Sequence, residues 1–338
     1  ADTAEAIFRA RRIPLLAAGL VALGGGVYFS MMVSSLSRQS SSSSTAHEAI
    51  PTGRPSAFSL ESARQFDQCL DASEKSMGIT SLRRDLGQAV SGHVMEVAVG
   101  TGRNMGYYDW RRILPSRDPV PRKTKPSSEA MLSYTAVDVS PDMLEVAIEK
   151  LPNALPGLRG IVPAVSTQTV TGRSADDKGF KLFSFLDGKV RLAQCDIQDT
   201  IPPPAADLAE GQEKYDTVVQ TFGLCSVADP GRVIRNMADM VKPGTGKIIL
   251  IEHGRSRWGI VNTLLDWSAP SHFQKYGCWW NRDIVDIVET AAAATPGLRV
   301  LRIERPFITQ LGTTVWLELA VDHPAAATTT ATTKQEKS

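Results

Sequence analysis

The most chemically informative segment of the chain is MEVAVGTGRN, residues 95–104, in which an apolar run breaks into a glycine turn. Glu96, Ala98, Gly100 and Gly102 follow the pattern acidic-x-small-x-Gly-x-Gly. Glycine adopts turn conformations that other residues avoid, and it lets a ligand lie against bare backbone. The turn is therefore expected to hold either a pyrophosphate or a smaller and less charged group.

A dinucleotide-binding turn needs the spacing Gly-x-Gly-x-x-Gly/Ala directly after a strand. Counting from Gly100 and Gly102, the third position of this pattern is Met105, and Gly106 comes one residue too late. A methionine at the third position would crowd the following helix against the strand. The spacing therefore disfavours a nicotinamide dinucleotide.

Apolar runs alternate with helical patterns along most of the chain, which is typical of a parallel sheet covered by helices on both faces. We expect strands at 93–99, 132–140, 190–196, 215–223 and 246–254, a closing hairpin from 298–306 and 314–322, and helices at 58–90, 101–109, 140–151, 230–241 and 281–294. Stretches at about 110–130 and 152–188 are interpreted as irregular insertions. The pattern predicts an α/β fold, with a doubly wound, Rossmann-like, seven-stranded, mostly parallel sheet that ends in an antiparallel hairpin.

The glycine turn resembles the first motif of class I S-adenosylmethionine-dependent methyltransferases. The resemblance implies that the glycines admit the methionine part of the cofactor and that Glu96 is a partner for its ammonium group. This chain has Ala98 where the family usually has glycine. The alternative for Glu96, and for the other acids of these motifs, is an ordinary structural role at a cap or turn.

Three further segments resemble the same family in the same order: VDVSPDMLEVA, LAQCDIQDTIP and MADMVKPGTGKIILIEHG. They imply that Asp138 binds the ribose hydroxyls, that Asp196 receives the adenine amino group and that Ile197 packs on the adenine ring. The gap from Gly102 to Asp138 is 138 − 102 = 36 residues instead of about 20, because an insertion lies between them. The residues expected to bind S-adenosyl-L-methionine are Glu96, Ala98, Gly100, Thr101, Gly102, Asn104, Asp138, Val139, Met143, Asp196, Ile197 and Thr221.

The methyl acceptor is expected at the segment QTFGLCSV, which lacks the Asn/Asp-Pro-Pro-aromatic pattern that grips an exocyclic nitrogen. The net charge of +1 also gives no broad basic surface, so nucleic acid is not expected as a partner. FGLCSV is similar to ubiquinone and menaquinone C-methyltransferases. A second pattern, LCSV…EH…W…D…GC…N, is similar to membrane-associated thiol methyltransferases. It is formed by Cys225, Glu252, His253, Trp258, Asp266, Gly277, Cys278 and Asn281. These resemblances imply a small hydrophobic acceptor.

Glu252 and His253 end the fifth strand and are predicted to be catalytic. A neutral acceptor needs a base within hydrogen-bond reach, and histidine titrates near neutral pH. The alternative is that His253 caps a turn or binds a backbone carbonyl. Aromatic residues are dense in 258–281, which indicates a lid over the acceptor, a membrane contact or a plain core cluster. The expected acceptor-side residues are Phe222, Cys225, Trp267, Cys278 and Asn281.

The four cysteines, at positions 69, 195, 225 and 278, are far apart and form no C-x-x-C pair. We therefore expect neither a metal site nor a disulfide framework. A pairing of Cys225 with Cys278 near the acceptor stays open as an alternative.

Residues 14–33 carry no charge over the length that a bilayer core demands. Arginines precede them and a serine-rich stretch follows, which favours a membrane anchor over a buried helix or a cleaved signal peptide. The predicted organisation is a basic segment at 1–13, a transmembrane helix at 14–33, a linker at 34–57, the methyltransferase domain at 58–325 and a disordered tail at 326–338.

The arginine-rich start is compatible with a mitochondrial protein whose targeting peptide has been removed. The chain as a whole also resembles fungal methyltransferase-like proteins of the mitochondrial inner membrane. Because positive charge stays on the matrix side, the domain is then expected to face the intermembrane space, with the matrix side as the alternative. Two functions follow as hypotheses: an enzyme that methylates a small hydrophobic acceptor drawn from the membrane, or a respiratory-chain assembly factor that binds a membrane-protein partner through its insertions.

Overall fold

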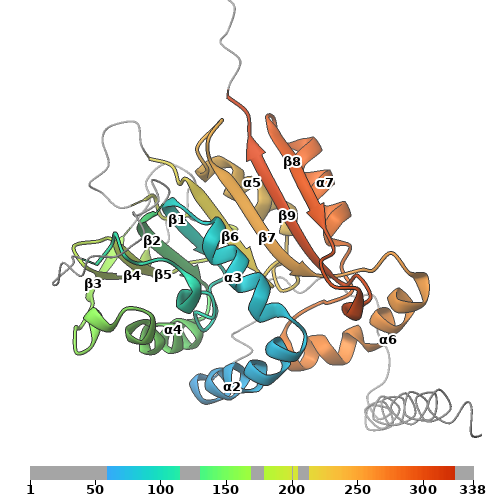
Figure 1. Cartoon of the computed structure of the whole chain (residues 1–338), viewed down its shortest axis with the longest axis horizontal. Coiled ribbons are helices and arrows are strands. Elements are labelled where there is room, and N and C mark those ends of the chain that lie inside the picture. The colour runs from blue at the N-terminus through green and yellow to red at the C-terminus, as the bar shows by residue number, and fades with distance from the viewer. Residues whose placement is uncertain (1–58, 115–129, 169–178, 200, 205–212, 324–338) are drawn as a thin grey trace, which may run out of the picture. The chain divides into compact units, whose positions relative to one another are not determined.

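The computed structural model describes residues 59–114, 130–168, 179–199, 201–204 and 213–323. Their centre is one mixed sheet with the strand order β3-β4-β5-β2-β1-β6-β7-β9-β8 (Figure 1). The strands are β1 (Gly92–Val97), β2 (Met131–Asp138), β3 (Ala164–Gln168), β4 (Phe180–Phe185), β5 (Val190–Gln194), β6 (Thr217–Thr221), β7 (Lys247–His253), β8 (Leu298–Glu304) and β9 (Thr314–Val321). Strands β5, β2, β1, β6 and β7 run parallel, so their carboxyl ends meet at one edge.

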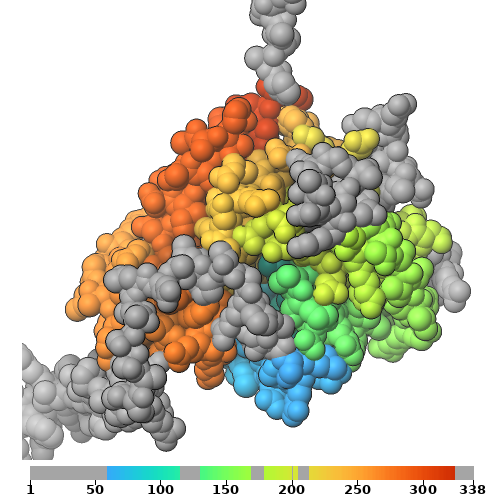
Figure 2. All heavy atoms as spheres, turned by 180° about the vertical axis from the view of Figure 1, so that it is seen from behind, coloured from blue at the N-terminus to red at the C-terminus, as the bar shows by residue number. Residues whose placement is uncertain are grey.

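Helices cover both faces of the sheet, which explains why its central strands are nearly continuous apolar runs. On one face, α5 (Pro230–Met240) and α7 (Ile284–Ala294) pack on Met95, Val218 and Leu250. On the other, α3 (Ile79–Ala89) and α4 (Pro141–Ala154) pack on Val94, Val219 and Ile249. Helix α2 (Leu60–Ser76), the first helix of the described residues, lies against α4 (Figures 1 and 2).

The predicted Rossmann-like, mostly parallel sheet is confirmed, but it has nine strands rather than seven. The stretch 152–188, expected to be irregular, contains β3 and β4, which extend the sheet antiparallel beyond β5. Strand β3 was missed because all of its residues are exposed, so no apolar alternation marks it.

The closing hairpin is present, but its antiparallel strand is not at the edge of the sheet. Strand β9 inserts between β7 and β8, and its residues Val315, Trp316 and Leu317 are buried on both faces. Strand β8 forms the edge and is largely exposed.

Two helix predictions needed correction. The pattern at 58–90 is two helices, α2 and α3, separated by Met77 and by Gly78, whose φ is 77°. The helix expected at 101–109 is wrong: the segment forms turns and one short 3₁₀ helix, η1 (Met105–Tyr107). A left-handed Gly102, with φ of 76°, keeps the backbone out of an α-helix there.

The predicted transmembrane helix at 14–33, its flanking segments, most of the insertion at 110–130 and the tail at 326–338 lie outside the described residues. Within the part of the chain that the structure describes, no helix combines the length and the apolar character needed to cross a membrane.

Candidate active site

The glycine turn leaves β1 through three left-handed residues: Ala98, Gly100 and Gly102 have φ values of 52°, 56° and 76°. A Cβ atom placed on Gly100 would meet nothing within 4 Å, whereas one on Gly102 would lie 2.8 Å from the sulfur of Met105. Gly102 is therefore needed for close packing. Gly100 leaves bare backbone beside open space, which is the property that a bound ligand requires.

Glu96, in β1, holds the glycine turn in place through hydrogen bonds to its carboxylate. It is 1% exposed, and its carboxylate accepts hydrogen bonds from the Asn104 amide and from the hydroxyls of Tyr108 and Tyr134, at 2.7–2.9 Å. Burial raises the pKa of this carboxyl, although the three donors oppose the shift. The contacts show that Glu96 fixes the conformation of the turn, while its expected role with the cofactor ammonium group stays a prediction.

Asp138 ends β2, the strand beside β1, and reaches across to the turn. Its Oδ2 accepts from the backbone N–H of Gly100 at 2.8 Å, and its Oδ1 accepts from that of Ser140 at 2.9 Å. Burial raises the pKa of Asp138, and these backbone donors oppose the shift. Next to it, Val139 is an apolar side chain that is 63% exposed.

Asp196 follows β5, the next strand of the sheet, so it shares the edge with Gly100 and Asp138. Its carboxylate accepts from the backbone and side chain of Gln198. Ile197 is 6% exposed and belongs to the apolar core, and Met143 packs between α2 and α4. The structure thus brings the predicted cofactor-binding acids to one edge, as parallel strands require.

An ionic network from α2 holds the turn, and sequence reasoning missed it. Asp67 accepts from the Thr101 hydroxyl at 2.6 Å and pairs with Arg103 and Lys150. Arg103 pairs in addition with Asp71 and Glu74. Thr101 and Arg103 lie 29–36 residues from their partners on α2, and Lys150 lies 83 residues from Asp67, so no local spacing could reveal the network.

Arg83 of α3 was also missed. This guanidinium is 4% exposed and pairs with Glu74 at 2.6 Å. It donates to the Asn104 side chain and to the hydroxyl of Thr221, at the end of β6. Arg83 therefore connects the glycine turn to the strand end where the acceptor is expected.

Glu252, at the end of β7, holds the loop that follows β6. Its Oε1 accepts from the backbone N–H groups of Gly223 and Leu224, at 3.0 and 3.1 Å. Its Oε2 is buried and has no hydrogen-bond partner among the described residues. Burial, helped by the nearby Cys225, raises the pKa of Glu252 to about 8.

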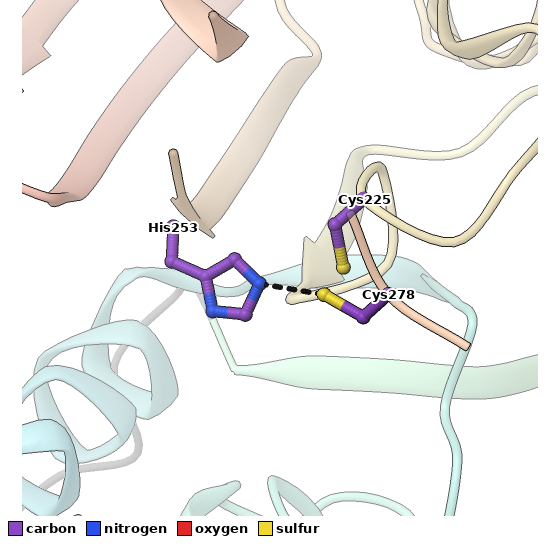
Figure 3. Close-up of side chains that lie close together, drawn as sticks. All are labelled: Cys225, His253 and Cys278. Carbon is purple, nitrogen blue, oxygen red and sulfur yellow. Dashed lines mark hydrogen bonds between the residues drawn. The ribbon is translucent and has the colours of Figure 1, made fainter. Parts of the chain in front are cut away.

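His253, Cys225 and Cys278 converge beside this loop, and their ligand atoms all lie within 4.8 Å of one another (Figure 3). The His253 Nε2 and the Cys278 Sγ are 2.9 Å apart. A hydrogen bond from Cys278, together with His253, lowers the pKa of Cys225 well below its usual value. The ring of Phe222, whose φ is 55°, lies 5.4 Å from that of His253.

The remaining acceptor-side residues lie on or near α6 (Gly259–Tyr276). Trp267 is 42% exposed on this helix, and Asn281 donates to Asp266, which also pairs with Arg255. Several aromatic rings of 258–281 stack in pairs: His272 on Trp280, and Phe273 on Trp279. Their expected function as a lid stays a prediction.

The sequence matches the family described as Methyltransferase domain over residues 80–291, which is more than half of the chain. The chain belongs to this methyltransferase family. The matched residues include the glycine turn, Asp138, Asp196 and the cluster of His253 with the two cysteines.

A relative of this methyltransferase domain is "Methyltransferase OMS1, mitochondrial" from Saccharomyces cerevisiae, which is 28% identical over 242 residues. The match covers 72% of this chain and 42% of the yeast protein, so the chain spans less than half the length of that relative.

Two solved structures also match the methyltransferase domain. An O-methyltransferase family protein from Burkholderia thailandensis is 16% identical, with a TM-score of 0.46 and coverage of 80% of this chain and 64% of that one. Magnesium protoporphyrin IX methyltransferase from Synechocystis PCC 6803, with bound SAH, is 14% identical, with a TM-score of 0.39 and coverage of 74% and 83%.

Proposed function

We propose that the chain is an S-adenosylmethionine-dependent methyltransferase that acts on a small hydrophobic acceptor. The observation that carries the proposal is the open backbone at Gly100 beside the Asp138 carboxylate, within a matched methyltransferase domain. The cofactor supplies an electrophilic methyl group on a sulfonium sulfur. The protein then contributes by positioning an acceptor in line with this group and by excluding water.

The residues present fit this cofactor. Open space at Gly100 accommodates the methionine part, and the Asp138 carboxylate offers charged acceptors to ribose hydroxyls. The exposed Val139 side chain provides an apolar surface for adenine beside Asp196. Because Asp138 already touches the Gly100 backbone, ligand binding at one of these residues affects the other.

The acceptor is proposed to bind at the ends of β6 and β7. Phe222 provides an apolar wall there, and Cys225 and Cys278 are buried. Glu252 and His253 are the titratable groups proposed to orient the acceptor or to take its proton. A small, largely apolar acceptor suits such surroundings.

We further propose that the protein works at the mitochondrial inner membrane, anchored by residues 14–33, with its domain in the intermembrane space. Two observations support a mitochondrial membrane protein: the yeast relative is named as mitochondrial, and residues 14–33 carry no charge. On α6, Ile260, Leu264 and Trp267 are exposed apolar residues at helical spacing. Such a face is suited to contact with lipid or with a membrane protein.

Titration calorimetry of S-adenosylmethionine into the full 338-residue chain tests the cofactor proposal. We expect saturable binding that Gly100→Arg abolishes, because the arginine fills the open space. Asp138→Ala should weaken binding by about 10- to 100-fold, the value of charged hydrogen bonds worth about 1.5–3 kcal/mol.

Two matched variants serve as controls. Gly160→Arg is suitable because Gly160 also has a positive φ, of 77°, and a Cβ atom added to it would likewise meet nothing within 4 Å. Asp322→Ala removes a surface carboxylate that pairs with Arg299 on the edge strand. Both controls should bind like the wild type, and a folded wild-type chain without any affinity for S-adenosylmethionine would contradict the proposal.

A second candidate function is favoured by the exposed apolar face of α6. We propose, as the alternative, an assembly or stabilising factor of the respiratory chain that retains the methyltransferase fold and binds a membrane-protein partner. In native gel electrophoresis of gently solubilised mitochondria, the protein would then migrate in a large complex. Leu264→Ser with Trp267→Ser should release it, whereas Gly100→Arg should not, and migration of the wild type as a single chain would reject this candidate.

A further inference from the structure

Two cysteines and a histidine form a cluster that has no assigned role in cofactor binding (Figure 3). Cys225 follows β6, His253 ends β7 and Cys278 follows α6, so the three ligands come from segments far apart in the chain. From the convergence of these side chains, we propose that Cys225, His253 and Cys278 bind a zinc-class divalent cation through two thiolates and one imidazole. The site is separate from the cofactor site, and metal binding does not depend on the proposed function. With the cation bound, His253 is a ligand, and Glu252 alone is the proposed base.

The donor set suits zinc. Thiolate sulfur and imidazole nitrogen are its preferred protein ligands, at about 2.3 and 2.0–2.1 Å, so tetrahedral coordination places sulfur and nitrogen about 3.6 Å apart and two sulfurs about 3.8 Å apart. In the structure, the His253 Nε2 and the Cys278 Sγ are 2.9 Å apart, and all three atoms lie within 4.8 Å. Shifts of about an ångström, of the kind that side-chain rotations supply, would bring the three ligand atoms to these separations.

Hydrogen bonds outside the cluster hold the ligands in place. The backbone N–H of Trp279 donates to the Cys225 carbonyl at 3.0 Å, which ties the two cysteine loops together. The His272 Nδ1 lies 2.9 Å from the Cys278 carbonyl oxygen, and Glu252 fixes the loop before Cys225. Support of this kind around first ligands is what a metal site requires.

Burial supports a cation at the cluster. Cys225 is 1% exposed and Cys278 is 6% exposed, so thiolates there would be poorly solvated. A divalent cation bound to two thiolates neutralises them.

Three protein ligands leave one position of a tetrahedral site open, as in catalytic rather than structural zinc sites. The ring of Phe222 lies beside His253, so this position belongs to the expected acceptor side. We infer that a small apolar thiol can occupy it as the thiolate, its proton passing to the solvent. This last step alone rests on the proposed function.

Metal analysis of the full chain, purified without chelators from zinc-supplemented cells, tests the site. We expect about one zinc per chain, reduced at least tenfold by Cys225→Ser, Cys278→Ser or His253→Asn. Cys69→Ser, which changes an exposed cysteine outside the cluster, should retain the metal. Circular dichroism establishes that each variant is folded.

Cobalt substitution of the wild-type chain tests whether the cluster binds a metal ion even if the variants fail to fold. Co²⁺ bound to two thiolates gives an intense sulfur-to-metal absorption band, which added zinc should abolish. A reduced, folded chain that gains no such band, or that isolates with a Cys225–Cys278 disulfide and takes up no metal after reduction, would overturn the site.

Benzyl mercaptan, a small apolar thiol, tests the open position in the cobalt-loaded chain. We expect it to change the visible cobalt spectrum, while a chain loaded with cobalt but unchanged by the thiol would reject the open position and leave the metal site standing. Because neither measurement uses S-adenosylmethionine, failure of the proposed methyl transfer is seen separately, in the calorimetry of Gly100→Arg and Asp138→Ala.

Discussion

At the scale of single residues, Ala98 determines how closely the glycine turn follows the family pattern. Its φ of 52° is in the left-handed region, which costs an L-residue about 1 kcal/mol. A Cβ atom on Gly223 would lie 2.8 Å from the Ala98 methyl group and 2.4 Å from the Gln220 amide nitrogen. The chain therefore tolerates alanine at 98 because glycine stands opposite at 223.

Ala98→Gly is expected to raise the free energy of unfolding by up to about 0.5 kcal/mol, because the relief of about 1 kcal/mol of left-handed strain slightly exceeds the entropy that glycine adds to the unfolded chain. Urea unfolding monitored by circular dichroism measures the difference. Ala72→Gly, at an exposed position inside α2, is the control and should lower stability by about 1 kcal/mol. If Ala98→Gly lowered the free energy of unfolding as much as the control does, the backbone at Ala98 would not be strained.

At the scale of elements, α2 determines the position of the glycine turn. The helix offers Asp67, Asp71 and Glu74 to Arg103, and Glu74 also binds Arg83 of α3. Glu74 is 6% exposed, so its charge is well shielded from water and depends on these partners. A helix outside the sheet thus helps to fix the conformation of the turn, together with the strand that precedes it.

The pH dependence of stability should report on Glu74. Burial by itself raises its pKa, but hydrogen bonds from Arg83 and Arg103 outweigh burial and lower the pKa below the ordinary 4.5. A lowered folded pKa contributes stability above the unfolded pKa, and this contribution is lost as pH falls through the folded value.

Glu74→Gln should therefore reduce the free energy of unfolding by about 3 kcal/mol at pH 7, since it leaves Arg83 buried without its charged partner. The difference in free energy of unfolding between this variant and the wild type should become smaller below about pH 4. Urea unfolding at pH 7 and below about pH 4 measures this difference. The control is Glu61→Gln, in the exposed first turn of the same helix. A gap that stays constant with pH would contradict the role of this charge.

At the scale of the whole molecule, the sheet brings chemistry from distant segments to one edge. Gly100, Asp138 and Asp196 could be predicted from sequence because each directly follows a strand, and the carboxyl ends of parallel strands align. The N-cap of α4 is equally local: the Ser140 hydroxyl accepts from the Met143 N–H three residues later. The positions of these strand ends could be predicted because buried strands are apolar runs bounded by turn residues.

The tertiary structure alone decided the rest. Strand β3 is exposed throughout and carries no apolar alternation, so only its pairing with β4 makes it part of the sheet. Cys225, His253 and Cys278 meet because β6, β7 and α6 end at one place, which no local spacing records. Local sequence determines which backbone conformations and strand ends occur, whereas contacts between remote side chains depend on how packed elements close the chain on itself.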